Sequence, residues 1–438
     1  MRTDISKIRA GLPALFCLLL LFTSVFSQAQ VLSRQQLDAQ LRENPEKLYG
    51  YFYNYPESGF RQTPAPRGYK PFYISHYGRH GARRTHQEAL YKTVLSELDR
   101  ACETGNLTEH GKSVRERVVS AYEEAKGLFG ELTPLGARQH KEIARRMVEN
   151  YPQIFRKKGV EVNAVSSNVR RCIMSMAAST SQLLVMNPGM DLSLSTGDRF
   201  MDYIAYDSEQ WHVLDADTSP WHASLREFEQ KSINPERLLS SLFTEPAQVE
   251  RPLDFTISLR WIVTNLNALD LGFTLDDVFT HEELQTIWET VNYKFYTLYG
   301  PNPENEGVPR KDACRLLEEI LSGAEAHLSA LKAGADLRYG HDVYIMKLMN
   351  LLCSGAGFQG TTNPYDAALY WQDFNVTPMA ANVQFVFYKN RKNDWLVKVL
   401  LNETELNLPL DSDKAPYYKW ADFQAYCKGL IEKWGDKD

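Results

Sequence analysis

Two segments of this chain repeat the order of apolar run, arginine-bearing turn and helix, and this repetition strongly constrains the fold. The first apolar run, residues 72–77, leads into the turn Arg79-His80-Gly81-Ala82-Arg83. The second run, residues 160–165, leads into residues 166–171 and then into a helical segment, 173–186, that is rich in small residues. Short strands that are followed by helices predict an α/β fold with a predominantly parallel sheet.

The turn at residues 79–83 has the residue types that bind phosphate. Guanidinium groups are planar forks that match phosphate oxygens and stay charged at any working pH, so Arg79 and Arg83 are candidate ligands. His80 stands between them, and a neutral imidazole can attack phosphorus and form a covalent intermediate. A helix that begins near Thr85 would add backbone N–H groups that point at the anion. The turn therefore predicts a phosphate site that contains its own nucleophile.

Two later segments offer further ligands for the same site. Arg171 follows the second apolar run, and the pair His341-Asp342 precedes a helical run at 343–352. The loops at the carboxyl ends of strands in an open α/β sheet converge on one crevice. Together with residues 79–83, these loops would offer three arginines and a second histidine to a phosphoryl group. Asp342 would then protonate a departing alkoxide, provided that its surroundings raise its pKa.

These segments resemble the motifs of the histidine acid phosphatase branch of the histidine phosphatases. That branch has an Arg-His-Gly-x-Arg-x-Pro signature, which reads Arg-His-Gly-Ala-Arg-Arg-Thr at 79–85 here, and a distal His-Asp pair. The resemblance implies a central, mostly parallel sheet flanked by helices, as in phosphoglycerate mutase, with a mostly helical inserted domain. Further matches are Leu-Thr-Pro-Leu-Gly at 132–136 with Gln139, and Ser-Ser-Asn-Val-Arg-Arg at 166–171 with Ser175.

The resemblance also implies a role for each site residue. His80 would be the nucleophile that forms a phosphohistidine, and Asp342 would donate a proton to the leaving group. Water would then hydrolyse the phosphoenzyme, and neither a metal nor a cofactor is implied. We assign Arg171 rather than Arg170 to the site, because Arg171-Cys172 falls where the family has Arg-Thr. The implied phosphate ligands are Arg79, Arg83, Arg171 and His341.

Several features leave the substrate open between inositol phosphates, as in a phytase, and phosphomonoesters in general. The distal His-Asp differs from the His-Ala-Glu that is typical of inositol polyphosphate phosphatases, whereas residues 378–382 and 400–403 resemble that subgroup. Thr85 replaces the usual proline, and its effect stays open. Three neighbouring basic residues are candidates to bind further phosphates of the substrate, although such charges more often face solvent. They are Arg84, His86 and Arg170.

Two other functions are compatible with these motifs. One is a mutase-like phosphotransferase that uses the same phosphohistidine, which a signal peptide and a distal acid disfavour. The other is a non-enzymatic polyanion-binding protein on the same fold, which the intact His80 and Asp342 disfavour.

The pattern of residues 1–29 predicts a signal peptide, and the competing interpretation is an uncleaved membrane anchor. A basic start precedes an apolar stretch, 12–26, that is short for a membrane span, and small residues follow before Gln30. We therefore expect an exported enzyme, periplasmic or secreted, with no membrane span after cleavage. Strand-like alternation disappears from 197–334, which predicts a helical insertion between two parts of an α/β catalytic core. Those parts are 30–196 and 335–438.

Composition limits the possible partners. The formal net charge of −6 disfavours general nucleic-acid binding, and it makes the local arginines stand out as the site for a small phosphorylated substrate. The cysteines after the leader are odd in number, so at least one thiol is unpaired. Their spacing does not match that of a zinc site. Disulfide connectivity and oligomeric state stay open. These cysteines are Cys102, Cys172, Cys314, Cys353 and Cys427.

Overall fold

The computed structural model describes residues 31–60, 62–354 and 360–436, and within them eight strands form one sheet. The strand order is β3-β2-β4-β1-β5-β6-β7, with β8 paired to β6. The signal peptide predicted at 1–29 lies outside the described residues. The strands are β1 (Lys70–Arg79), β2 (Glu161–Ser166), β3 (Asp191–Thr196), β4 (Gly334–Gly340), β5 (Asn382–Lys389), β6 (Trp395–Leu401), β7 (Thr404–Glu405) and β8 (Tyr417–Lys419).

The sheet has a parallel part and an antiparallel part. Strands β3, β2, β4 and β1 run parallel to one another, and β5 and β6 extend the sheet from β1 as an antiparallel hairpin. The apolar runs at 72–77 and 160–165 form β1 and β2. The predicted α/β class, with a central sheet flanked by helices, is confirmed.

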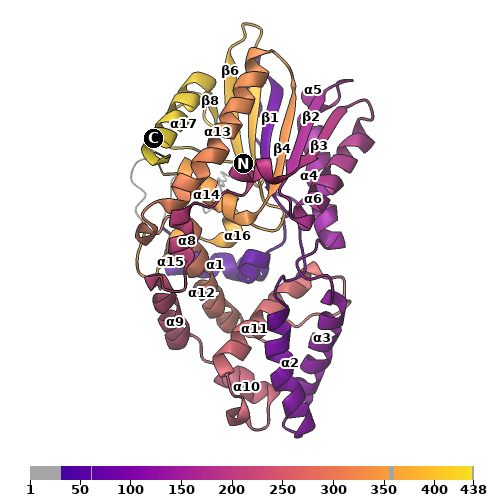
Figure 1. Ribbon diagram of the computed structural model, residues 1–438, viewed down its shortest axis with the longest axis vertical. Coiled ribbons are helices and arrows are strands. Elements are labelled where there is room, and N and C mark those ends of the chain that lie inside the picture. The colour runs from indigo at the N-terminus through magenta and orange to yellow at the C-terminus, as the bar shows by residue number, and fades with distance from the viewer. Residues whose placement is uncertain (1–30, 61, 355–359, 437–438) are drawn as a thin grey trace, which may run out of the picture.

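Helices cover both faces of the sheet (Figure 1). Successive strand residues point to opposite faces, so Tyr73 and Tyr77 pack with one set of helices and Ile74 packs with the other. The first set is α13 (Val308–Ser329), α14 (Asp342–Leu352) and α17 (Trp420–Trp434). The second set is α4 (Pro134–Asn150), α5 (Pro152–Phe155) and α6 (Arg170–Met186).

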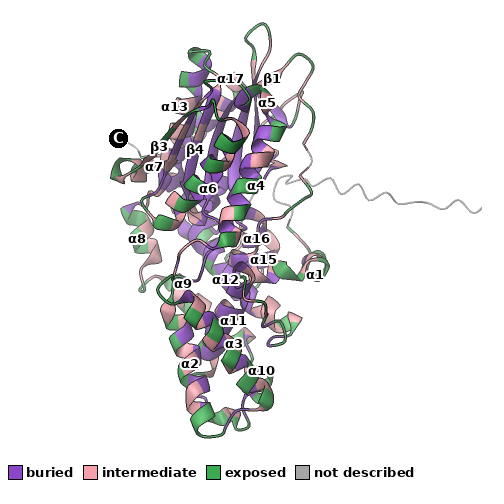
Figure 2. Cartoon of the chain, turned by 90° about the vertical axis from the view of Figure 1, so that its right-hand side faces the viewer, coloured by how far each residue is buried: buried purple, intermediate pink, exposed green. Residues whose placement is uncertain are grey.

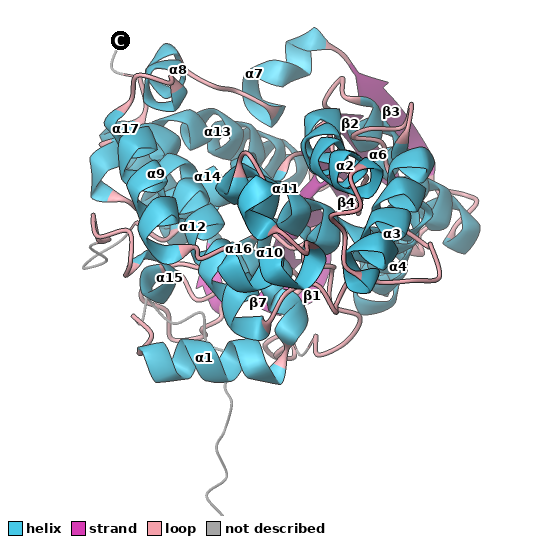
Figure 3. Cartoon of the chain, turned by 90° about the horizontal axis from the view of Figure 1, so that it is seen from below, coloured by secondary structure: helices cyan, strands magenta, loops and turns pink. Residues whose placement is uncertain are grey.

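A separate group of helices forms the lower part of the molecule in Figure 1. It has its own apolar core, to which residues of α2 (Glu88–Glu103), α3 (Glu109–Ala125), α10 (Glu236–Leu242) and α11 (Pro252–Asn265) contribute. We call this group the helical lobe. Seen from below, these helices lie in front of the sheet (Figure 3).

The region predicted as a helical insertion, 197–334, holds helices and loops up to β4 within the described chain. Two helices of the lobe, α2 and α3, come from before that region, and α13 at its end packs on the sheet. The division into 30–196, 197–334 and 335–438 stays a prediction. The remaining α-helices are α1 (Arg34–Glu43), α7 (Met201–Ile204), α8 (Glu209–Asp215), α9 (Pro220–Ser232), α12 (His281–Tyr299), α15 (Ala367–Tyr370) and α16 (Asp373–Val376). The 3-10 helices are η1 (Pro45–Phe52), η2 (Asp198–Phe200), η3 (Pro246–Gln248), η4 (Leu266–Ala268) and η5 (Pro303–Asn305).

Burial follows this architecture. Figure 2 shows buried residues along the strands and on the inner faces of the helices, with exposed residues on the outer faces. None of the described helices combines the length and apolar character that a membrane crossing needs. All five cysteines that the sequence left unassigned are free thiols.

Candidate active site

Three loops meet at the carboxyl ends of the parallel strands. Strand β4 lies between β1 and β2, and its last residues pair with both neighbours, Gly340 with Arg79 and Tyr339 with Ser166. The chain therefore leaves all three strands at one edge of the sheet, where ligand sites of open α/β folds form. The segments that begin at His80, Ser167 and His341 come together as the sequence predicted.

His80 is buried, and one of its ring nitrogens has no hydrogen-bond partner among the described residues. Its Nδ1 lies 2.9 Å from the Gly81 carbonyl oxygen, so we assign the proton to Nδ1, which leaves Nε2 with a free lone pair. Burial, followed by the charges of Arg171, Arg79 and Arg83, holds the pKa of His80 well below 6.5. The imidazole is therefore neutral.

The backbone after His80 is fixed by the first turn of α4 and by α6. The Gly81 N–H donates to Ser175 Oγ at 3.1 Å, and the Ala82 N–H donates to Gln139 Oε1 at 2.8 Å. A Cβ atom on Gly81 would lie 2.4 Å from the carbonyl oxygen of Gly136, so this close approach requires glycine. Within the Leu-Thr-Pro-Leu-Gly match at 132–136, the Thr133 hydroxyl accepts from the Gly136 N–H and caps α4.

Arg79 is fully buried and held from several sides. Its Nη1 donates to the carbonyl oxygens of Tyr51 at 3.0 Å and Thr377 at 2.6 Å. Its Nη2 lies 3.0 Å from Asp342 Oδ2, as an ion pair without hydrogen-bond geometry. The guanidinium is thus held by η1, by the residue that follows α16 and by α14.

Tyr51 connects the two arginines of the turn, and sequence reasoning missed it. Its hydroxyl accepts from Arg83 Nη2 at 2.9 Å, and its ring centroid lies 4.4 Å from the Arg79 guanidinium carbon. The ring also stacks on Phe295 of α12, with centroids 5.0 Å apart. The one sequence signal is the preceding Gly50, whose φ of 55° turns η1.

Arg171 and His341 complete the set of candidate phosphate ligands. We call Arg79, Arg83, Arg171 and His341 the arginine pocket. Arg171 Nη2 lies 3.4 Å from His341 Nδ1, and Ser167 Oγ lies 3.3 Å from His341 Nε2. The rings of His341 and His80 are 5.8 Å apart between centroids. Burial, followed by Arg171, lowers the pKa of His341 to about 4, so this ring is also neutral.

Asp342 is the first residue of α14, and it is buried near the guanidinium groups of Arg79 and Arg83. Burial alone would raise its pKa, but Arg79, His341 and Arg83 together outweigh burial and lower the pKa below 3.8. A proton donor needs a raised pKa, and Asp342 does not meet that condition in the free enzyme. The reason is the ion pair with Arg79, which lies 263 positions away along the chain and which the spacing could not reveal.

The three additional basic candidates differ in their surroundings. Arg84 Nε donates to Glu124 at 3.0 Å, and Arg170 Nε donates to Glu131 at 2.7 Å, so both charges are compensated by carboxylates. The pKa of His86 is lowered to about 4 by burial and then by Arg83 and Arg171. His86 is therefore the candidate in electrostatic contact with the pocket.

Thr85 takes part in a contact that proline could not make. Its N–H donates to Asn265 Oδ1 at 2.8 Å, and Asn265 Nδ2 donates to the Arg83 carbonyl at 2.9 Å. Asn265 is the last residue of α11, so the helical lobe holds the backbone of segment 79–85, which we call the phosphate turn. Proline has no N–H to donate. Sequence reasoning missed Asn265, and only the irregular Thr85 hinted at it.

Across the described ranges, His, Cys, Asp and Glu side chains form no group of three or more that could hold a metal ion. The candidate site is built from arginines and histidines, whose N–H groups are of the kind that can donate to phosphate oxygens.

Comparison with known proteins agrees with this geometry. The sequence model of the histidine phosphatase superfamily (branch 2) matches residues 78–402. Multiple inositol polyphosphate phosphatase 1 of Gallus gallus is 22% identical over 343 residues, which are 71% of each chain.

Two solved structures share the fold. The Bifidobacterium longum multiple inositol polyphosphate phosphatase in complex with phosphate has a TM-score of 0.71 at 17% identity, over 87% of this chain and 97% of that chain. The phytase from D. castellii has a TM-score of 0.65 at 13% identity, over 93% of this chain and 92% of that chain. The segment that matches the family model runs from the end of β1 to the end of β6. Because of this match, the chain belongs to branch 2 of the histidine phosphatase superfamily and is a histidine acid phosphatase.

Proposed function

We propose that the enzyme hydrolyses phosphomonoesters through a phosphohistidine on His80. The observation that carries this proposal is the state of that ring, which is neutral and buried among arginines with Nε2 free of partners. A free imidazole nitrogen with a lone pair is the form that attacks phosphorus. Arg79, Arg83, Arg171 and His341 would hold the oxygens of the phosphoryl group during the transfer.

The reaction has two steps. His80 Nε2 attacks phosphorus, the bond from phosphorus to the ester oxygen breaks, and Asp342 gives its proton to the departing oxygen. Water then attacks the phosphohistidine, which releases inorganic phosphate and restores the ring, while the Asp342 carboxylate accepts the proton of that water.

The low pKa of Asp342 in the free enzyme is compatible with this role. Its pKa is held down by Arg79, His341 and Arg83. A bound phosphate would neutralise the arginines and repel the carboxylate, and both effects raise the pKa of an acid. Asp342 would thus become protonated as substrate binds.

We include inositol phosphates in the proposed substrate class. Three observations support them: the names of the relatives, the subgroup-like residues at 378–382 and 400–403, and His86 beside the pocket. We also propose export to the periplasm or the medium, with residues 1–29 removed. The protein recovered outside the cytoplasm is then expected to begin at Gln30.

A substrate panel tests the proposed function. Inositol hexakisphosphate, a sugar phosphate and an aryl phosphate are compared by kcat/KM and by product. The highest kcat/KM for the inositol phosphate, with free inorganic phosphate as product, would support the proposal. Transfer of phosphate to a second hydroxyl would indicate a mutase, and binding without turnover would indicate a polyanion-binding protein. Turnover of the other two substrates alone would exclude the phytase-like activity.

A further inference from the structure

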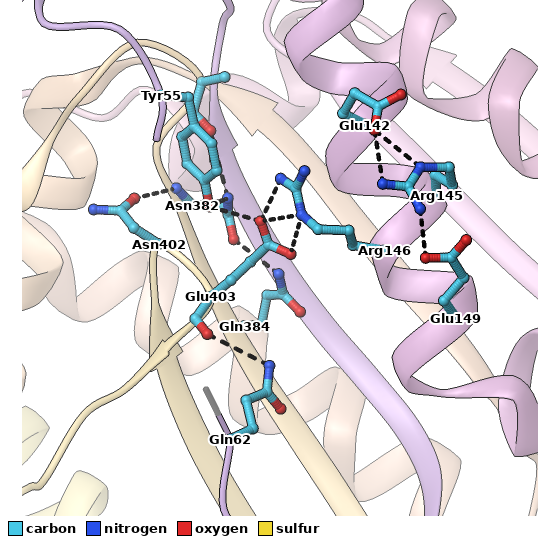
Figure 4. A network of polar contacts seen from close by, with 11 residues as sticks. Tyr55, Gln62, Glu142, Arg145, Arg146, Glu149, Asn382, Gln384, Asn402 and Glu403 are labelled. Carbon is cyan, nitrogen blue, oxygen red and sulfur yellow. Dashed lines mark hydrogen bonds and ion pairs between the residues drawn. The ribbon is translucent and has the colours of Figure 1, made fainter. Parts of the chain in front are cut away.

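The two subgroup-like segments, 378–382 and 400–403, contact each other through Asn382 and Asn402 (Figure 4). The Asn402 N–H donates to the Asn382 carbonyl at 2.8 Å, and the Asn382 N–H donates to Asn402 Oδ1 at 3.0 Å. Asn402 Nδ2 also donates to the Val376 carbonyl at 3.2 Å. None of these residues belongs to the phosphate pocket, so their arrangement calls for another role.

The first of these segments holds the backbone of the nucleophile. Just beyond the last β1–β5 pair, Gly78 with Asn382, the Arg79 N–H donates to the Ala381 carbonyl at 2.7 Å. The Ala380 N–H then donates to the His80 carbonyl at 3.1 Å. On its other side, the His80 N–H donates to the Gly340 carbonyl at 3.0 Å. The peptide of His80 is therefore held between β4 and the turn at Ala380.

The backbone at this turn adopts a conformation that side chains other than glycine disfavour. Ala380 has a φ of 60°, and in the second segment Asn402 and Glu403 have φ values of 50° and 61°. Left-handed residues of this kind persist only when their surroundings hold them, and they concentrate at functional sites. The contacts around Ala380 therefore fix the turn that holds the His80 carbonyl.

A buried chain of polar contacts reaches this turn from α4. Glu403 is 2% exposed and accepts from Arg146 Nη2 at 2.7 Å and from the Tyr55 hydroxyl at 3.0 Å. The Tyr55 oxygen in turn accepts from Asn382 Nδ2 at 3.0 Å. Gln384 Nε2 fixes the other end of that amide by donating to Asn382 Oδ1 at 2.9 Å. We call Arg146, Glu403, Tyr55 and Asn382 the Glu403 bracket (Figure 4).

We propose that the Glu403 bracket positions His80 for its attack on phosphorus, acting through the turn at Ala380. Its members are positioning residues, because they reach the turn at Ala380 through Asn382, whose Nδ2 donates to the Ala380 carbonyl at 3.4 Å, and none of them is a proposed phosphate ligand. The inference rests on the proposed phosphohistidine at His80. Small displacements of a nucleophile slow a reaction strongly, whereas binding by the arginines depends on other contacts.

The first variant, Tyr55→Phe, removes the hydroxyl that joins Glu403 to Asn382 and keeps the ring beside Phe60. Phosphoenzyme formation in a single turnover is expected to slow about tenfold or more per folded molecule. The inhibition constant of inorganic phosphate is expected to change by less than about twofold, since the arginine pocket is intact.

The second pair of variants compares neighbours on α4. Arg146→Met removes the half-buried partner of the buried Glu403. Arg145→Met instead removes an arginine whose partners, among the described residues, are Glu142 and Glu149 on the helix surface (Figure 4). The first change is expected to slow phosphoenzyme formation, and the second is expected to leave it at the wild-type rate. Because an unpaired buried Glu403 destabilises the fold, Arg146→Met/Glu403→Gln serves where Arg146→Met alone does not fold.

The outcomes separate this inference from the proposed function. Rates are measured well below each melting temperature and divided by the concentration of folded enzyme. A wild-type rate in Tyr55→Phe and in the Arg146 variants, with only the melting temperature lowered, would overturn the positioning role. A wild-type enzyme that forms no phosphate adduct on His80 would overturn the proposed function instead.

Discussion

Arg79 Nη2 lies 3.0 Å from Asp342 Oδ2, and both side chains are buried. One residue ends β1 and the other begins α14, so the pair joins the two halves of the candidate site. The contact keeps Asp342 ionised in the free enzyme, because Arg79 and its neighbours lower the pKa of that carboxyl. Under the proposed mechanism, the substrate must therefore compete with Asp342 for Arg79 before Asp342 can donate a proton.

Asp342→Asn is expected to slow substrates with poor leaving groups much more than aryl phosphates. An alkoxide needs a proton to depart, so kcat/KM for inositol or sugar phosphates should fall about 10²-fold or more, whereas an aryl phosphate should lose about tenfold or less. The measurement is kcat/KM for both classes on the same preparation. Equal losses for the two classes would contradict the role of Asp342 as proton donor.

Tyr51→Phe is expected to weaken phosphate binding. The variant removes the oxygen that accepts from Arg83 and keeps the ring that stacks on Phe295. Hydrogen bonds to charged groups contribute about 1.5–3 kcal/mol, so the inhibition constant of inorganic phosphate should rise about tenfold or more. An unchanged inhibition constant would mean that Tyr51 does not hold Arg83 for the ligand.

Asn265 and Thr85 are expected to act as a unit. Asn265→Leu removes both contacts to the phosphate turn, and Thr85→Pro removes the N–H that donates to Asn265. Each change should raise KM, and the double variant should raise KM by less than the product of the two single effects. Residues in direct contact typically show coupling of about 0.5–3 kcal/mol in such cycles. Strictly multiplicative effects would show that the lobe does not hold the turn through this amide.

Two buried histidines are expected to make the fold sensitive to acid. Burial lowers the pKa of His76 to about 3 and that of His140 to about 4. Unfolding restores the ordinary value near 6.5, so below that pH the unfolded chain binds protons that the folded chain does not. Each histidine should then lower the free energy of unfolding by about 1.4 kcal/mol per pH unit, until the pH approaches its folded-state pKa.

Urea denaturation at pH 7 and pH 5 measures this effect. His76→Gln should reduce the difference in the free energy of unfolding between the two pH values, whereas His212→Gln, an exposed position, serves as the control. The same pH dependence in His76→Gln and the wild type would contradict the assignment.

The sequence predicted the parts of the site that depend on local order along the chain. Turns that follow parallel strands meet at one sheet edge, so His80, Arg171 and His341 could be placed together from their positions alone. The hairpin of β5 and β6 likewise depends on local order, because two apolar segments flank the polar turn at 390–393.

Contacts between distant segments were beyond such reasoning. The contact between Tyr51 and Arg83 depends on how η1 packs against the phosphate turn. The contact between Asn265 and Thr85 depends on how the helical lobe packs against the same turn. The charge state of Asp342 depends on its distance from Arg79, which no spacing encodes. Likewise, Arg84 gave no sign in the sequence that Glu124 would compensate its charge.

The most direct test is rapid quenching of the enzyme with a ³²P-labelled phosphomonoester, followed by mapping of the labelled residue. The label should appear on His80, stable to base and labile to acid, and it should be absent from His80→Ala. Label on another residue, or none in an enzyme that turns over, would contradict the phosphohistidine mechanism.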